Sequence, residues 1–163
     1  MEKISRFFGG NKTETTIDAK NRLCIPAALR KQLGHEAMES FVIEPGPKRS
    51  IILFPKDVFV SVIEPDRLRL PEDEETFQML NEVAALSSFS ELDSQGRIML
   101  TLIQLQYAEI EKEIVVVGRG DRIQVWDKAN YYRSLGDPVK SFSSEKYFNF
   151  QKRIEEYKEK DRT

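Results

Sequence analysis

Short apolar runs separated by turn-forming residues dominate the first 130 positions and predict β-strands. Phe41–Ile43 and Ile51–Phe54 flank a loop that contains two prolines, and Val115–Val117 and Ile123–Trp126 flank a loop that contains two glycines. Apolar runs of this length around Pro- or Gly-rich loops are typical of β-hairpins. The pattern therefore predicts two hairpins in which both strands are apolar.

Two further turns, one in each half of the chain, share the same order of residue types. Thr13–Ile17 and Arg22–Ile25 flank a polar turn, which predicts another hairpin, and the second half of the chain contains a similar turn before Arg97. Asn21 and Gly96 occupy matching positions in these turns. Glycine adopts a positive φ freely and asparagine tolerates it better than most residues, so both satisfy the same backbone requirement.

Helical segments lie between and after the strands. Pro26 suits the first turn of a helix that we expect to run to about Leu33, with Gly34 as its stop. Leu102–Tyr107 occupies the same place in the second half. The remaining predicted helices are Lys56–Val62, Glu72–Leu86, Ala129–Leu135 and Ser144–Thr163.

The order of these segments shows that the chain contains an internal repeat. Asp18–Ile25 returns as Asp93–Leu100, with the same order of acid, turn, arginine and apolar strand. Neither copy alone covers the faces of its sheet, and two copies that interleave their strands close each other's edges. We therefore expect an α+β fold, a pseudo-two-fold swapped-hairpin β-barrel with short flanking helices and a C-terminal helix. The expected parts are a first repeat (7–62), a helical connector (63–86), a second repeat (87–135) and a helical tail (136–163).

Composition narrows the class of protein. The 163 residues contain no apolar run of about 18 residues that could span a membrane, and the N-terminus lacks the apolar stretch of a signal peptide. Cys24 is the only cysteine, which excludes an intrachain disulfide and a cysteine-based metal cluster. These features predict a soluble cytoplasmic protein without cofactor or metal.

The net charge of −2 hides a strong asymmetry along the chain. Residues 1–31 contain seven cations and three acids, whereas residues 57–91 contain two cations and nine acids. Such segregation is typical of a nucleic-acid-binding surface at one end of a molecule. The alternative is that the acidic stretch only solvates a helix, and composition alone does not separate the two.

The first turn carries the strongest candidate site. Lys20 and Arg22 lie on an exposed tip, where cations can reach phosphates and an arginine can also bind a guanine edge. We expect Asp18 to structure the turn by accepting backbone N–H groups or by holding the arginine. The alternative is that the Asp–Arg pair in each copy is a salt bridge that only defines the fold. The second turn has Gln95 where the first has Lys20.

Other residues are weaker candidates. Arg30 and Lys31 complement a helix C-terminus, and His35 has no cysteine or carboxylate cluster near it in sequence. Cys24 aligns with Met99 on an apolar strand, which predicts a buried small hydrophobic residue. No phosphate loop, nucleophile–base order or paired-carboxylate motif is present, so we do not expect an enzyme.

These motifs carry a resemblance to a known family. Asp18–Arg22 with Ile25, Pro26 and Arg30, repeated at Leu92–Arg97, resembles the Asp-x-Lys-Gly-Arg…Ile-Pro…Arg signature of the MraZ family, bacterial relatives of AbrB-type swapped-hairpin DNA-binding domains. The resemblance covers about residues 7–135. This chain departs from the signature at three places: Asn21 replaces a glycine, Thr101-Leu102 stand where prolines are usual, and Leu105 stands where an arginine is expected.

The resemblance implies a nucleoid-associated transcriptional regulator of the division and cell-wall gene cluster. It implies ring-shaped homo-oligomers that bind short direct repeats in double-stranded DNA upstream of their own operon, with no small-molecule substrate and no membrane partner. By position, Lys20 and Arg22 would be the main DNA contacts, with Arg6 and Lys12 as helpers. Asp18, Asn21, Asp93, Gly96 and Arg97 would structure the two turns. The rival interpretation is a ring-forming assembly module that does not bind DNA.

Overall fold

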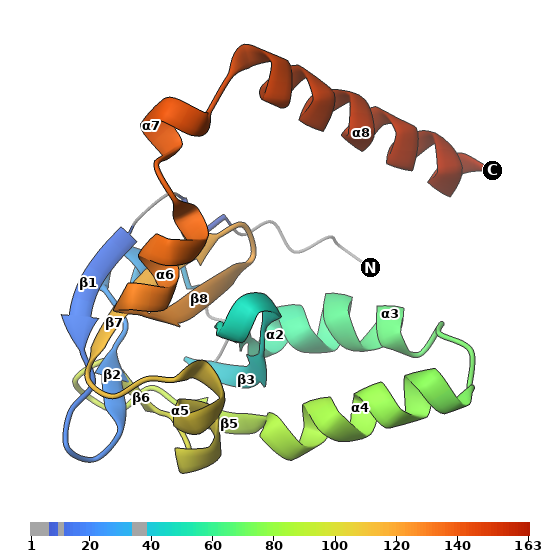
Figure 1. Cartoon of the computed structure of the whole chain (residues 1–163). Coiled ribbons are helices and arrows are strands. Elements are labelled where there is room, and N and C mark those ends of the chain that lie inside the picture. The colour runs from blue at the N-terminus through green and yellow to red at the C-terminus, as the bar shows by residue number, and fades with distance from the viewer. Residues whose placement is uncertain (1–6, 10–11, 34–38) are drawn as a thin grey trace. The chain divides into compact units, whose positions relative to one another are not determined.

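The computed structural model describes residues 7–9, 12–33 and 39–163, which divide into two units, one within residues 1–131 and one within residues 132–163 (Figure 1). All strands among the described residues belong to the first unit. No helix among the described residues combines the length and the apolar character needed to cross a membrane.

An antiparallel six-stranded sheet forms the body of the first unit. Its strands in spatial order are β1 (Lys12–Thr16), β7 (Glu113–Arg119), β8 (Arg122–Asp127), β4 (Ile51–Pro55), β3 (Ser40–Pro45) and β5 (Ser88–Glu91). A separate two-stranded ribbon pairs β2 (Arg22–Cys24) with β6 (Arg97–Met99). This arrangement confirms the α+β class with antiparallel strands.

Strand pairs within and between the two sequence copies build the sheets. β3–β4 and β7–β8 each lie within one copy and confirm the two predicted apolar hairpins. β1 pairs with β7, β2 with β6, β3 with β5 and β4 with β8, and each of these pairs takes one strand from either copy. Within the described part of the chain, β1 and β5 have one neighbour each in the six-stranded sheet. The pairing therefore gives an open sheet and a ribbon, and the expected closed barrel is not confirmed.

The predicted hairpin between Thr13–Ile17 and Arg22–Ile25 is wrong in its pairing. The backbone reverses at Asp18–Arg22, where the Asp18 N–H donates to the Arg22 carbonyl at 2.9 Å, but β1 and β2 then enter different sheets. The reason lies in the other copy. Leu23 lies opposite Ile98 in the β2–β6 ribbon and both side chains are fully buried, so each copy covers the other's apolar residues.

The hydrophobic core lies between the ribbon and the six-stranded sheet. Its largest fully buried side chains come from both copies: Phe8, Leu23, Ile25, Leu29, Phe41, Ile43, Ile51, Leu53, Ile98, Leu100, Ile114 and Ile123. The prediction that Cys24 is buried is wrong, because side chains alternate along a strand and Leu23 takes the inward position. Met99 is 54% exposed for the same reason.

The helices after β2 and β6 differ in length. α1 (Ala27–Arg30) begins after Pro26, has no side-chain N-cap, and is shorter than predicted; the expected stop at Gly34 lies outside the described residues. α5 (Leu102–Ala108) confirms its prediction. Thr101 and Gln104 form a capping box at its N-terminus, which satisfies two backbone N–H groups that a helix start leaves free.

The segment between the copies is helical, as predicted. A short 3-10 turn, η2 (Pro47–Arg49), joins β3 to β4. A continuous helical stretch then comprises α2 (Lys56–Val58), the π-helical segment η3 (Phe59–Ile63) and α3 (Glu64–Arg67), followed by α4 (Glu74–Leu86). Asp73 caps α4 by accepting the Thr76 N–H at 2.8 Å. The guanidinium of Arg67 ties α3 to the sheet through two hydrogen bonds of 2.7 and 2.6 Å to Glu44 of β3.

The second unit is helical. α6 (Lys128–Leu135) begins in the first unit and enters the second, which continues with α7 (Pro138–Ser141) and α8 (Ser144–Arg162). Asp137 and Ser143 cap the last two helices by accepting backbone N–H groups. The predicted tail helix is thus confirmed, and none of the residues of α8 is buried.

Candidate nucleic-acid interface

The turn after β1 is held by a single carboxylate. Asp18 Oδ1 accepts the backbone N–H groups of Lys20 and Arg22, both at 2.9 Å, and Asp18 Oδ2 accepts Arg22 Nε–H at 2.9 Å. The Asn21 N–H closes the turn on the Asp18 carbonyl at 3.0 Å, and Asn21 has a φ of 62°. One side chain therefore fixes both the backbone of the turn and the direction of the arginine.

The turn before β6 repeats this geometry. Asp93 Oδ1 accepts the N–H groups of Gln95 and Arg97 at 2.9 Å, and Asp93 Oδ2 accepts Arg97 Nε–H at 2.7 Å. Gly96, with a φ of 73°, closes the turn at 3.0 Å from the Asp93 carbonyl. The two turns differ chiefly in what they expose, because the first presents a lysine where the second presents a glutamine.

The two turns lie next to each other across the β2–β6 ribbon. The Leu100 N–H donates to the Asn21 carbonyl, and the Ile25 N–H donates to the Gly96 carbonyl, both at 2.9 Å. Arg97 Nη1 lies 3.9 Å from Asp18 Oδ2, so Arg97 contacts the carboxylates of both turns. Arg97 consequently links the two copies, whereas Arg22 forms an ion pair with Asp18 of its own turn.

Arg30 performs a role that the sequence did not indicate. Its Nε–H donates to the Ile25 carbonyl at 3.0 Å, and its guanidinium packs over the second turn. A Cβ on Gly96 would lie 2.5 Å from Arg30 Nη1. Glycine at position 96 suits this contact, because only glycine combines the positive φ with so close an approach.

The other predicted basic residues are not all gathered at this site. Lys20 and Arg22 lie on one turn; the side chain of Lys20 is exposed, and that of Arg22 is 25% exposed. Lys12 lies at the far end of β1, about 20 Å of extended strand from Asp18. Arg6 lies outside the described residues, as does His35.

The pKa of both carboxylates is lower in this setting than its ordinary value. The backbone N–H of Arg22, and then its guanidinium, lower the pKa of Asp18 below its usual range, and desolvation opposes them only in part. The N–H and guanidinium of Arg97 lower the pKa of Asp93 in the same way. Both acids stay ionised at neutral pH, so each keeps its arginine oriented.

The arrangement suits binding of an anion better than bond-making chemistry. It presents an ammonium group and a partly exposed guanidinium on a rigid turn, which are the groups that bind phosphates and base edges. Across the described ranges, no group of three or more His, Cys, Asp or Glu side chains is placed to hold a metal ion.

Comparison with known proteins shows which family the chain belongs to. A family model described as "MraZ protein, putative antitoxin-like" matches residues 7–80 and 85–153. The chain belongs to the MraZ family. It is 35% identical over 138 residues to a protein of Lactiplantibacillus plantarum, covering 83% of this chain and 92% of that protein. It is 31% identical over 130 residues to one of Oenococcus oeni, covering 78% and 86%, and 29% identical over 150 residues to one of Cytophaga hutchinsonii, covering 86% and 94%. All three relatives are named transcriptional regulator MraZ.

Proposed function

We propose that this protein is a transcriptional regulator that binds double-stranded DNA through the turn Asp18–Arg22. The observation that carries the proposal is the difference between two turns of the same geometry. Asp18 and Asp93 hold their turns by equivalent hydrogen bonds, yet only the first turn exposes a lysine. A feature that serves only the fold does not need that difference, whereas a surface that binds phosphates gains from it.

Each residue of the turn has a part in the proposed binding. Lys20 neutralises a phosphate as a flexible point charge. Arg22, whose Nε is held by Asp18, keeps its Nη groups for a phosphate or a guanine edge in the major groove. Lys12, at the other end of β1, supports binding through a phosphate farther along the duplex, and Arg6 is a further helper. Asp18, Asn21, Asp93, Gly96 and Arg97 keep the two turns in shape.

We further propose that the chain acts as a homo-oligomer, a ring that presents several copies of the first turn to short direct repeats upstream of its own operon. The expected operon is the division and cell-wall gene cluster, and the expected location is the nucleoid. Strand exchange between the copies supports a pseudo-two-fold barrel as the unit of such a ring. Linked sites raise avidity by about 10²–10⁴ when their spacing matches that of the repeats. The expected division into residues 7–62, 63–86, 87–135 and 136–163 belongs to this proposal.

The rival is an assembly module that has lost DNA binding. One observation favours it: the segment between the copies exposes large apolar side chains, among them Leu68 (78%) and Phe77 (63%). Exposed apolar residues on an acidic segment suit a protein partner better than DNA. This surface lies on other elements than the turn Asp18–Arg22, so it adds to the proposed DNA binding without replacing it.

A binding assay separates these proposals. Fluorescence anisotropy is measured on duplexes taken from upstream of the protein's own coding sequence, with three repeats, one repeat, or a shuffled sequence of the same composition. We expect tight binding to three repeats, a disproportionate loss with one, and weak salt-sensitive binding to the shuffled duplex. Equal affinity for all three duplexes would refute sequence-specific binding, and absence of binding at low salt would favour the assembly module.

A further inference from the structure

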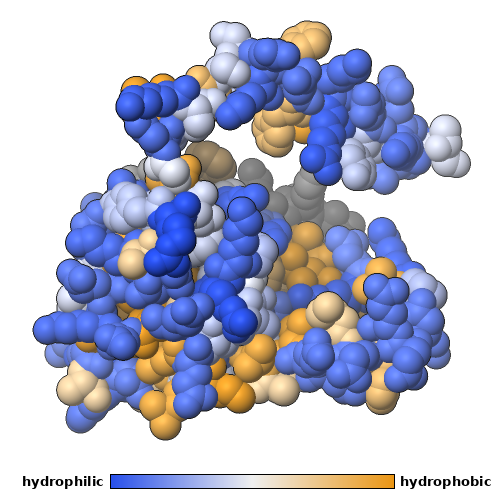
Figure 2. Space-filling view, in the orientation of Figure 1, coloured by the Kyte–Doolittle hydropathy of each residue, from blue (hydrophilic) through white to orange (hydrophobic). Residues whose placement is uncertain are grey.

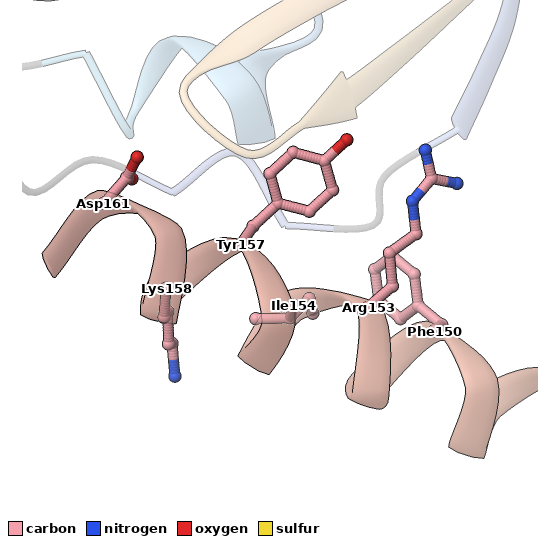
Figure 3. Close-up of a pocket in the computed structure, with 6 residues that line it drawn as sticks. All are labelled: Phe150, Arg153, Ile154, Tyr157, Lys158 and Asp161. Atoms are coloured by element: carbon pink, nitrogen blue, oxygen red, sulfur yellow. The ribbon is translucent and has the colours of Figure 1, made fainter. Parts of the chain in front are cut away.

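One face of α8 carries an apolar seam that is largely exposed, and at its N-terminal end the ring of Tyr147 contacts that of Phe142. Tyr147, Phe150, Ile154 and Tyr157 follow one another at intervals of three, four and three residues, the spacing of a helix-pairing seam. Phe150 is 59% exposed and Tyr157 is 56% exposed. Phe150, Ile154 and Tyr157 line a shallow pocket along the helix together with Arg153, Lys158 and Asp161, as Figure 3 shows.

The charges beside this seam are almost all of one sign. In a heptad in which the four seam residues take the a and d positions, the flanking positions are filled by Lys146, Gln151, Arg153, Lys158 and Lys160. Four of the five acids of α8 lie away from these flanks, at Glu145, Glu155, Glu156 and Glu159. Two copies of α8 paired along the seam would bring cations together, which destabilises a helix pair. The seam therefore suits an apolar surface with acidic edges.

The segment α3–α4 offers such a surface. α4 contains Glu74, Glu75 and Glu82 and no Lys or Arg, and its exposed face includes Phe77. Figure 2 shows hydrophobic side chains at the surface among the hydrophilic ones over α3 and α4. Leu80 is 38% exposed and lines a groove between the two helices.

The groove is suited to receive an aromatic side chain. Its cavity volume is about 360 Å³, and Leu68, Leu80 and Val83 contribute apolar walls. Glu64 lies at the same groove, and the carboxylate of Glu44 is already paired with Arg67. A buried aromatic anchor surrounded by charged rim residues is a common way in which protein surfaces bind each other.

We propose that the apolar seam of α8 docks on the α3–α4 groove of a second copy of this chain. Complementary charge identifies the occupant: a seam flanked by cations meets the segment 64–82, which contains seven acids and two cations, and both surfaces belong to every copy. The inference rests on the proposed homo-oligomer and names the surfaces that join neighbouring copies. Because donor and acceptor surfaces differ, the contact is head-to-tail, which closes into a ring or continues as an open chain.

Charge reversal tests the proposal without removing apolar side chains. The α8 variant is Arg153→Glu/Lys158→Glu, and the α4 variant is Glu74→Lys/Glu82→Lys. The control is Lys152→Glu/Arg162→Glu, which changes the net charge by the same amount as the α8 variant but at positions away from the seam. Circular dichroism establishes that every full-length variant is folded, and light scattering after size exclusion at several concentrations gives the assembly mass.

We expect each charge-reversed variant alone to associate about tenfold more weakly than the wild type, and the control to associate normally. An equimolar mixture of the α8 and α4 variants should assemble again, because each then offers the charge that the other lacks. A wild type that is monomeric throughout, variants that assemble as well as the wild type, or a mixture no larger than its components would overturn the proposal. The last result is also the one expected if α8 docks on the α3–α4 groove of its own chain, because mixing two variants cannot restore a contact within one chain.

The same proteins separate this proposal from the proposed function. Neither variant alters the turn Asp18–Arg22, so both should bind a single-repeat duplex with the wild-type affinity. If the wild type binds no DNA but the mixture restores assembly, the proposed function fails and the docking surface stands. If DNA binding is normal but charge reversal leaves assembly unchanged, the docking surface fails alone.

Discussion

Exchanging Lys20 for glutamine should make the first turn resemble the second and should weaken the salt dependence of DNA binding by a calculable amount. The first turn offers two cations, Lys20 and Arg22, and the second offers Gln95 and Arg97 on the same hydrogen-bond framework. Because Asp18 accepts the backbone N–H of residue 20, and not its side chain, Lys20→Gln leaves that framework intact. The variant therefore removes a charge and little else.

The size of the effect follows from counterion release. Each neutralised phosphate contributes a slope of about −0.9 in log affinity against log salt, so two cations give about −1.8 per turn and one gives about −0.9. Between 50 and 200 mM salt, affinity per turn should fall about 12-fold for the wild type and about 3.5-fold for Lys20→Gln. The assay is fluorescence anisotropy with a short single-repeat duplex at four salt concentrations.

The reciprocal variant Gln95→Lys serves as the control. It adds the same charge to a turn of the same geometry that we do not place against DNA, so it should leave the slope close to the wild-type value. An unchanged slope for Lys20→Gln, or a steeper slope for Gln95→Lys than for the wild type, would refute the assignment of DNA contact to the first turn alone.

Three further predictions concern stability and are measured by thermal or denaturant unfolding. Gly96→Ala should be more destabilising than Gly120→Ala. Both glycines have a positive φ, which costs an alanine about 1–2 kcal/mol, but only at Gly96 would the new Cβ also overlap a guanidinium. Equal losses in the free energy of unfolding would contradict the close packing. Asp93→Asn should flatten the acid limb of the stability profile, because a carboxyl whose pKa is lowered on folding contributes stability above about pH 4 and loses it as the pH falls through the folded-state value; an unchanged acid limb would argue against that role. Glu44→Gln should cost about 1–3 kcal/mol because the guanidinium of Arg67 loses its charged partner; a neutral effect would show that the pair does not hold α3 to the sheet.

The sequence predicted most of the elements and the hairpins β3–β4 and β7–β8, but not the partners of β1 and β2. Leu102–Tyr107 and Glu72–Leu86 each appear as helices within two residues of their predicted bounds, because caps and periodicity are local signals. The pairing of β2 with β6 is not local. It depends on which apolar residue can cover Leu23, and the answer, Ile98, lies in the other copy of the repeat.

At the candidate site, too, the sequence predicted the local contacts but not the contacts between the two copies. The Asp-turn-Arg motif made the two turns visible in the sequence, since hydrogen bonds within five residues follow from residue type and spacing. The contact of Arg30 with Gly96 and the ion pair of Arg97 with Asp18 cross from one copy to the other, and no local pattern predicts them. Cys24 was misplaced because an apolar run of three residues does not say which of its members face the core.

The most direct test of the central claim compares DNA binding by Lys20→Ala/Arg22→Ala and by Arg97→Ala, at equal assembly mass, on the duplex from upstream of the protein's own coding sequence. Lys20 and Arg22 belong to the turn proposed to face DNA, whereas Arg97 bridges the carboxylates of both turns and supports the fold. The account predicts that the double variant loses specific binding and that Arg97→Ala keeps most of the affinity while unfolding at a lower temperature. Specific binding that survives in the double variant but is lost in Arg97→Ala would contradict it.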